Sequence, residues 1–108
     1  MSLFAVRREA GATWVDDAGA FDQPAVGDHA AFMNQLAEDG FVHFAGPLAG
    51  SERGRIRVLL IAEAADEAEL VARLAGDPWE LADRIRTTSI EPWTLLVGQL
   101  GSTVTPQR

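Results

Sequence analysis

The sequence predicts a small α+β domain built on one antiparallel sheet of four strands. Its 108 residues, 47% of them hydrophobic, suffice for one core. Strand-like and helix-like segments follow one another in the order strand, helix, strand, strand, helix, strand. Right-handed crossovers then place both helices on one face, the first and third strands at the centre and the last strand at an edge. This arrangement is the ferredoxin-like βαββαβ fold.

The N-terminal part predicts a strand followed by a long loop. Ser2 to Arg8 (SLFAVRR) are short, apolar and flanked by polar residues, which is typical of a strand. Glu9 to Gly27 follow neither the helical nor the strand period and carry Trp14 and Phe21. Loops of this length inside small domains are often lids or binding loops. We therefore expect this one to fold over the mouth of a pocket, with Trp14 packed and partly buried.

The first helix is predicted over Asp28 to Asp39 (DHAAFMNQLAED), with Asp28 as its N-cap and Gly40 at its end. It carries an apolar stripe at i, i+3, i+4 and i+7, made of His29, Phe32, Met33 and Leu36. The stripe places His29 toward the sheet rather than toward solvent. His29 is therefore a candidate site residue, although a histidine in such a place more often serves only the core.

Two strand-like runs follow, Phe41 to Leu48 and Arg55 to Ala65, joined by a turn rich in Gly and Ser. They predict an antiparallel hairpin. Within the second run, Val58 to Ala62 are apolar on both alternating faces, whereas a strand with one wet face would alternate with polar residues. Because two helices cover one face only, we expect a second copy of the chain to cover the other face, sheet against sheet, in a homodimer.

The C-terminal part predicts a helix, a short helical turn and an edge strand. Asp66 to Leu74 carries a capping-box pattern at its start. A turn or short helical segment follows at residues 77–84, and Thr88 to Val97 is the last strand, which Pro92 confines to an edge or a bulge. The domain is predicted to span residues 1–98, with residues 99–108 as a flexible C-terminal tail.

Composition and charge disfavour several classes of function. The net charge is −7, from 9 basic and 16 acidic residues, whereas a nucleic-acid or anionic-membrane surface needs a basic footprint. The chain has no cysteine and only two histidines, so neither a thiol nucleophile nor a metal site is expected. No phosphate-binding glycine loop is present, and no cofactor is implied. No apolar window approaches the length of a membrane span, so we expect a cytoplasmic protein with a small-molecule ligand.

Three short features stand in a defined order along the chain. They are a His that opens the first helix (His29), a Gly-Pro pair that ends the second strand (Gly46 and Pro47), and an Asp-Pro-aromatic sequence after the second helix (Asp77 to Trp79). They lie in the stretches GDHAAFMNQLAEDGFVHFAGPL and AGDPW. Together they closely resemble the YCII-related family of dimeric α+β barrel proteins, and the likeness runs from the first strand to SIEPW.

The resemblance implies a site. A His and an Asp are suspected of forming the active site in this family, which points to His29 as a base and to Asp77 as the residue that orients it. Gly46, Pro47 and Trp79 become pocket walls on the same ground. Trp14, on the loop, is the aromatic residue that best fits a pocket. For Asp77 the alternative is a cap of the turn or segment that follows it.

Two classes of function remain open. The first is an enzyme, lyase-like or isomerase-like and without a cofactor, that acts on a small cyclic or unsaturated compound by proton abstraction, elimination or isomerisation. The resemblance supports it, since a few relatives eliminate chloride from chlorinated, hydroxylated rings. The second is a non-catalytic dimeric module that holds a ligand or a partner protein in the same pocket. The enzyme hypothesis predicts that the His29 imidazole and the Asp77 carboxylate lie within direct or one-water hydrogen-bonding reach.

Overall fold

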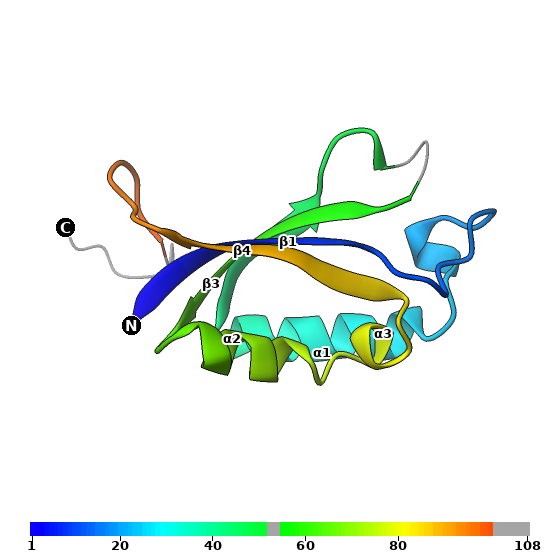
Figure 1. Cartoon of the computed structure of the whole chain (residues 1–108), viewed down its shortest axis with the longest axis horizontal. Coiled ribbons are helices and arrows are strands. Elements are labelled where there is room, and N and C mark those ends of the chain that lie inside the picture. The colour runs from blue at the N-terminus through cyan, green and yellow to red at the C-terminus, as the bar shows by residue number, and fades with distance from the viewer. Residues whose placement is uncertain (52–54, 101–108) are drawn as a thin grey trace.

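The computed structural model of the chain describes residues 1–51 and 55–100. Its sheet has the order β2-β3-β1-β4, and every neighbouring pair is antiparallel. The α-helices of the described part lie on one side of the sheet (Figure 1). The elements are β1 (Ser2–Ala10), a 3-10 turn η1 (Ala20–Asp22), α1 (Val26–Glu38), β2 (Val42–Pro47), β3 (Arg57–Ala64), α2 (Glu67–Leu74), α3 (Pro78–Leu81) and β4 (Ile85–Trp93).

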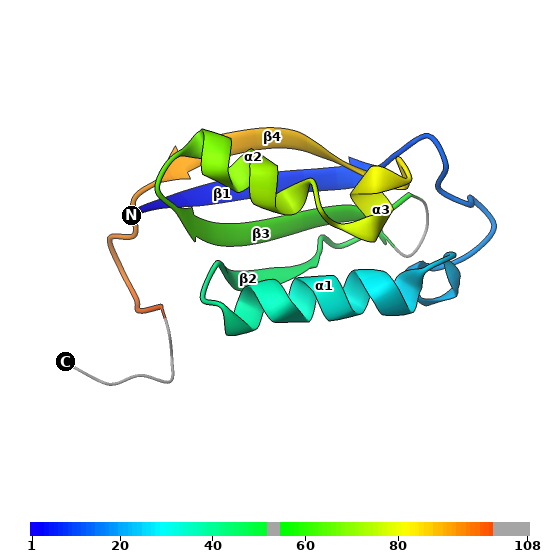
Figure 2. The ribbon, with the colours of Figure 1, turned by 90° about the horizontal axis from the view of Figure 1, so that it is seen from below.

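The observed topology confirms the predicted α+β fold. β1 and β3 occupy the centre of the described sheet, and β4 lies at its edge, where Pro92 pairs with Phe4 of β1. In Figure 2, α1 runs along the β2 side of the sheet and α2 lies over its centre. The chain thus has one helix layer and one sheet layer.

The apolar core fills the space between these two layers. Alternate residues of the central strands point into it, and among them Val6 and Leu60 are fully buried partners in the register of β1 and β3. Leu70 and Leu74 of α2 and Leu36 of α1 close the core from the helix side. Burial of these side chains supplies the main driving force for folding.

The helices α1 and α2 differ in how their N-termini are capped. Asp66 accepts a hydrogen bond from the Glu69 N–H at 2.9 Å, so α2 begins with the predicted cap. The prediction for α1 was wrong, because this helix begins at Val26 and Asp28 lies in its first turn. Its N-cap is Ala25, which has a left-handed backbone with φ of 62° and makes no side-chain cap. The loop before α1, and not a capping side chain, therefore sets the start of the helix.

Two strands have limits other than those predicted. β1 continues through Ala10, two residues beyond the expected end. β4 begins at Ile85 and ends at Trp93, whereas Thr88 to Val97 was expected. It starts early because the chain turns sharply at Asp83, which has φ of 58°, and it ends where Trp93 pairs with Leu3, near the start of β1. The predicted tail from residue 101 onward lies outside the described residues.

The face of the sheet that carries no helix is apolar at its centre and partly exposed. Leu59 of β3 is 38% exposed and Phe44 of β2 is 54% exposed. Gly46 pairs with Leu59 and Phe44 pairs with Ile61, so these residues share this face. The run Val58 to Ala62 of β3, which is apolar on both faces, thus has one buried face and one open face in the single chain.

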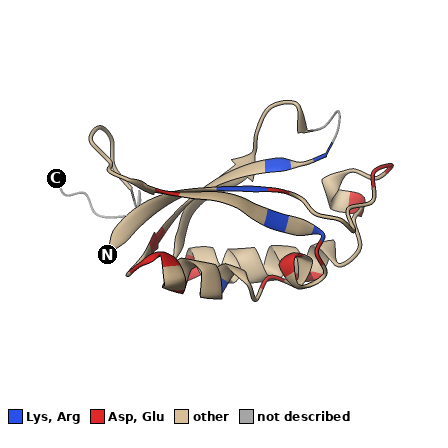
Figure 3. Cartoon of the chain, viewed as in Figure 1, with Lys and Arg blue, Asp and Glu red and all other residues tan. Residues whose placement is uncertain are grey.

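Charged residues are distributed unevenly over the two layers. Acidic residues lie mostly in helices and loops, whereas several arginines lie on strands (Figure 3). Exposed arginines make surface ion pairs, as Arg55 does with Asp16 and Arg86 with Asp83. Arg8 differs because only 1% of its side chain is exposed. Within residues 1–51 and 55–100, no helix is long and apolar enough to cross a membrane.

Candidate active site

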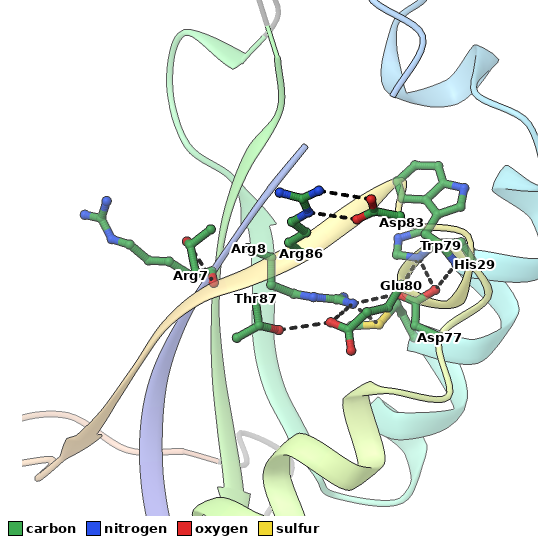
Figure 4. A network of polar contacts seen from close by, with 11 residues as sticks. Arg7, Arg8, His29, Asp77, Trp79, Glu80, Asp83, Arg86 and Thr87 are labelled. Atoms are coloured by element: carbon green, nitrogen blue, oxygen red, sulfur yellow. Dashed lines mark hydrogen bonds and ion pairs between the residues drawn. The ribbon is translucent and has the colours of Figure 1, made fainter. Parts of the chain in front are cut away.

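The starts of α1 and α3 bring two of the predicted site residues into direct contact. His29 lies in the first turn of α1, and Asp77 is the N-cap of α3. The His29 Nδ1 atom is 2.9 Å from each of the two Asp77 carboxylate oxygens, although 48 positions separate the residues in the sequence (Figure 4). The expected proximity is therefore present in the fold.

The other contacts of Asp77 indicate which atom carries the shared proton. The Trp79 backbone N–H donates to Asp77 Oδ1 at 2.9 Å, and the Arg8 guanidinium lies 3.0 Å from Oδ2. Both partners are donors, so the carboxylate acts as an acceptor and the His29 Nδ1–H must be the donor. The neutral imidazole then has its lone pair on Nε2.

Asp77 is fully buried, yet its surroundings favour the charged carboxylate. Burial alone would raise the pKa of Asp77, because it disfavours the charged form. The hydrogen bond from His29, the hydrogen bond from the Trp79 N–H and the positive charge of Arg8 outweigh burial and lower the pKa of Asp77 below its ordinary value. The alternative prediction, that Asp77 is a cap, is confirmed, since its carboxylate accepts from the Trp79 N–H at the start of α3.

Arg8 and Glu80 belong to the same network but were not predicted. Arg8 Nη2 lies 3.4 Å from Glu80 Oε2, which also accepts from the Thr87 hydroxyl at 3.1 Å. The sequence held a signal for Arg8, because Phe4, Val6 and Arg8 alternate along β1 and so face the same side. Glu80 showed no such signal, since it lies in a four-residue helix.

The imidazole stacks on one tryptophan, and a second tryptophan packs against the first. The Trp79 ring stacks on His29 with a centroid distance of 3.9 Å and an interplanar angle of 6°. Trp14 meets Trp79 edge-on at 5.6 Å and is 6% exposed, so the loop tryptophan is packed as expected. Trp79 is fixed further by its indole N–H, which donates to the Pro24 carbonyl at 2.9 Å. Closure of the loop over a ligand stays a prediction.

The loop before α1 is held by one buried amide. Gln23 is 2% exposed, and its side chain bonds to the backbone of Val15 in both directions, at 2.9 and 2.8 Å. It also donates to the Ala18 carbonyl at 2.9 Å. These bonds hold a segment that has no regular secondary structure. They fix the backbone of Val15, which directly follows Trp14, and so help to position Trp14.

A cavity of about 870 Å³ lies between α1, β2, β3 and this loop. Its walls include all the predicted pocket residues, Trp14, Gly46, Pro47 and Trp79, together with His29. Asp77 lies behind His29 and does not line the cavity. Because Asp77 engages Nδ1, Nε2 is the imidazole nitrogen that can meet a molecule in the cavity.

The second histidine lies elsewhere. His43 Nε2 is 2.7 Å from Glu63 Oε1, and His43 does not line the cavity. Across residues 1–51 and 55–100, no three His, Asp or Glu side chains are grouped in a way that could hold a metal ion. Of the two histidines, His29 lines the cavity, and its imidazole is backed by the buried Asp77 carboxylate.

The family model described as the YCII-related domain matches residues 9–94. The chain belongs to this family. The matched range contains every residue of the site except Arg8, from Trp14 to Glu80. No curated protein matches the chain.

A solved structure shares the fold of this YCII-related chain. It is 5-chloro-2-hydroxyhydroquinone dehydrochlorinase (TftG) from Burkholderia phenoliruptrix AC1100, in complex with 2,5-dihydroxybenzoquinone. The TM-score is 0.60 at 20% sequence identity, over 85% of this chain and 93% of that chain. At this identity the likeness establishes the fold.

Proposed function

We propose that this YCII-related chain is an enzyme that transfers a proton to and from a small cyclic or unsaturated organic compound. His29 is the base, and Asp77 orients it. The observation that carries the proposal is the His29 imidazole at the cavity wall, whose Nδ1 is bound by a buried carboxylate. Membership of the YCII-related family and the fold shared with a dehydrochlorinase support a reaction on a small molecule.

The geometry suits an acid–base cycle. Nε2 accepts a proton from a C–H or O–H group of the substrate, and the positive charge that develops on the imidazole is stabilised by the Asp77 carboxylate at 2.9 Å. In an elimination, the electrons of the broken C–H bond form a double bond, and the leaving group departs with its bonding pair. In an isomerisation, the imidazolium returns the proton to a different atom of the substrate.

The cavity walls favour a flat, mostly apolar substrate. Trp14 and Trp79 line the cavity together with His29 and contribute aromatic surface to it. Gly46 and Pro47 form part of the opposite wall, on β2. Gly46 pairs with Leu59, so a side chain at this position would lie on the helix-free face, and Gly46 contributes backbone to the cavity wall.

The test uses a defined probe, 5-chloro-2-hydroxyhydroquinone, with chloride release as the readout and 2,5-dihydroxybenzoquinone as a binding probe. We expect the wild-type chain to release chloride and H29Q to lower turnover by about 10²- to 10⁴-fold, the usual contribution of a general base. H43Q, which alters the other histidine, should retain turnover. Binding of the quinone without turnover would favour the non-catalytic module, and absence of both would overturn the proposed substrate class.

We infer further that the helix-free face of the sheet is covered by a second copy of the chain. Leu59, Phe44 and Trp93 on this face are 38%, 54% and 40% exposed, and exposed apolar patches of this kind mark interfaces. Light scattering at micromolar concentration should give a dimer for the wild type and a folded monomer for L59E. A stable wild-type monomer would contradict the inference without bearing on the chemistry of His29.

A further inference from the structure

Arg8 is a buried charge that stability alone does not explain. Its side chain is 1% exposed, and within residues 1–51 and 55–100 only one of its nitrogens, Nη2, contacts carboxylate oxygens. Nη1 lies 3.7 Å from the Met33 sulfur, a weak acceptor, and Nε is buried without a hydrogen-bond partner among the described residues. A buried ion pair with incomplete partners is often no more stable than an apolar replacement of similar size. A contribution to stability therefore does not account for a buried arginine at this position.

We propose that Arg8 is a positioning residue for the reaction at His29: it keeps the Asp77 carboxylate ionised and aimed, and so fixes the proton of the neutral imidazole on Nδ1. The inference rests on the proposed function for its consequence in catalysis. Its structural part concerns only the contacts of Arg8, Asp77 and His29.

The contacts on Asp77 show how Arg8 acts. Oδ1 accepts from the Trp79 N–H and Oδ2 faces Arg8, so the two donors hold the carboxylate plane from opposite ends. His29 Nδ1 lies 2.9 Å from both oxygens, between these donors. Figure 4 shows Arg8 reaching this group from β1, while Arg7 points away from it. Loss of Arg8 would leave Oδ2 without its cationic partner.

The consequence concerns the proton on the imidazole. Loss of Arg8 removes one of the three partners that offset the burial of Asp77, and so shifts this carboxyl group toward its neutral form, which carries an O–H donor. A protonated Asp77 can donate to Nδ1, and the neutral imidazole then holds its own proton on Nε2. In that tautomer Nε2 has no lone pair and cannot accept a proton from a substrate.

Glu80 balances Arg8 from the other side. It lies 3.4 Å from Nη2 and is 21% exposed, and the Thr87 hydroxyl also bonds to it. Among the residues that the structure describes, the charged or titratable groups around Asp77 are Arg8 from β1, His29 from α1 and, across Arg8, Glu80 from α3. Glu80, Arg8, Asp77 and His29 thus form one chain of contacts, and His29 lies at the cavity wall.

The primary test is the tautomer of His29, read from the imidazole ¹⁵N shifts above the pH at which the ring is protonated. We expect the Nδ1–H form in the wild type and an increased share of the Nε2–H form in R8M. R8K, which keeps a charge, should restore part of the wild-type signal. R7M is the matched control, because Arg7 is the exposed neighbour on the other face of β1, and it should keep the wild-type tautomer.

Activity supplies the second readout. With the chlorinated probe, R8M should lower kcat by about 10- to 100-fold with little change in KM, the size typical for a group that orients a catalytic residue. If R8M does not fold, R8M/E80Q removes the stranded Glu80 charge and is compared in the same way. A folded R8M chain with the wild-type tautomer would overturn the inference. The NMR result needs no turnover, so a failure of the proposed reaction is seen separately, in the wild type and H29Q.

Discussion

The chain contains two histidine–carboxylate pairs that look alike by distance and differ in everything around them. His29 and His43 are each 17% exposed, and they lie 2.9 and 2.7 Å from Asp77 and Glu63. Asp77, however, is fully buried and also contacts Arg8 and the Trp79 N–H, whereas Glu63 is 36% exposed. The cavity lies at the first pair only. Burial and further partners of the carboxylate, rather than the distance, distinguish the candidate site.

The largest expected effect that separates the two pairs is on stability. D77N removes the carboxylate charge beside buried Arg8, and loss of one partner of a buried ion pair costs about 3–5 kcal/mol. E63Q alters a solvent-exposed pair, whose loss costs about 0–1 kcal/mol. The free energy of unfolding at neutral pH, measured by urea denaturation, compares the two variants directly.

Equal losses in D77N and E63Q would contradict this comparison, because the burial of Asp77 would then have no energetic consequence. The double variant R8M/D77N provides a control. It removes both charges of the buried pair, so it should recover part of the stability lost in D77N.

The sequence predicted the fold well because its signals are local. Alternation in the strands, the capping pattern at Asp66 and Pro92 in the last strand gave the element order and the edge position of β4. The limits of β4 were predicted less well, since they depend on the turn at Asp83 and on where β1 begins. Both are properties of the folded sheet and not of the segment itself.

The site was predictable in part. The contact between His29 and Asp77 followed from the family resemblance, because no periodicity relates residues 48 positions apart. Arg8 could have been found from its place on the buried face of β1. The role of Gln23 could not, since its partners are backbone groups of an irregular loop, and side-chain type alone does not reveal them.

A smaller effect is expected from pH, and it tests the charge state of Asp77. The pKa of Asp77 is lowered in the folded chain despite its burial, by His29, the Trp79 N–H and Arg8. Its contribution to stability is therefore complete above the unfolded pKa of about 4 and is lost as the pH falls through the lower, folded pKa. D77N lacks this contribution. The difference in free energy of unfolding between the wild type and D77N should thus shrink as the pH is lowered from about 6 to about 3.

The exposed carboxyl of Asp83 gives the matched comparison for this titration. The pKa of Asp83 is also lowered, through its hydrogen bond with Arg86, and it contributes with the same sign. Solvent screens this ion pair. The difference in free energy of unfolding between the wild type and D83N should therefore change less over the same pH range. A difference between the wild type and D77N that stays constant with pH would mean that Asp77 is not a paired carboxylate in the folded chain. Asp77 would then not be the charged acceptor that keeps the His29 proton on Nδ1.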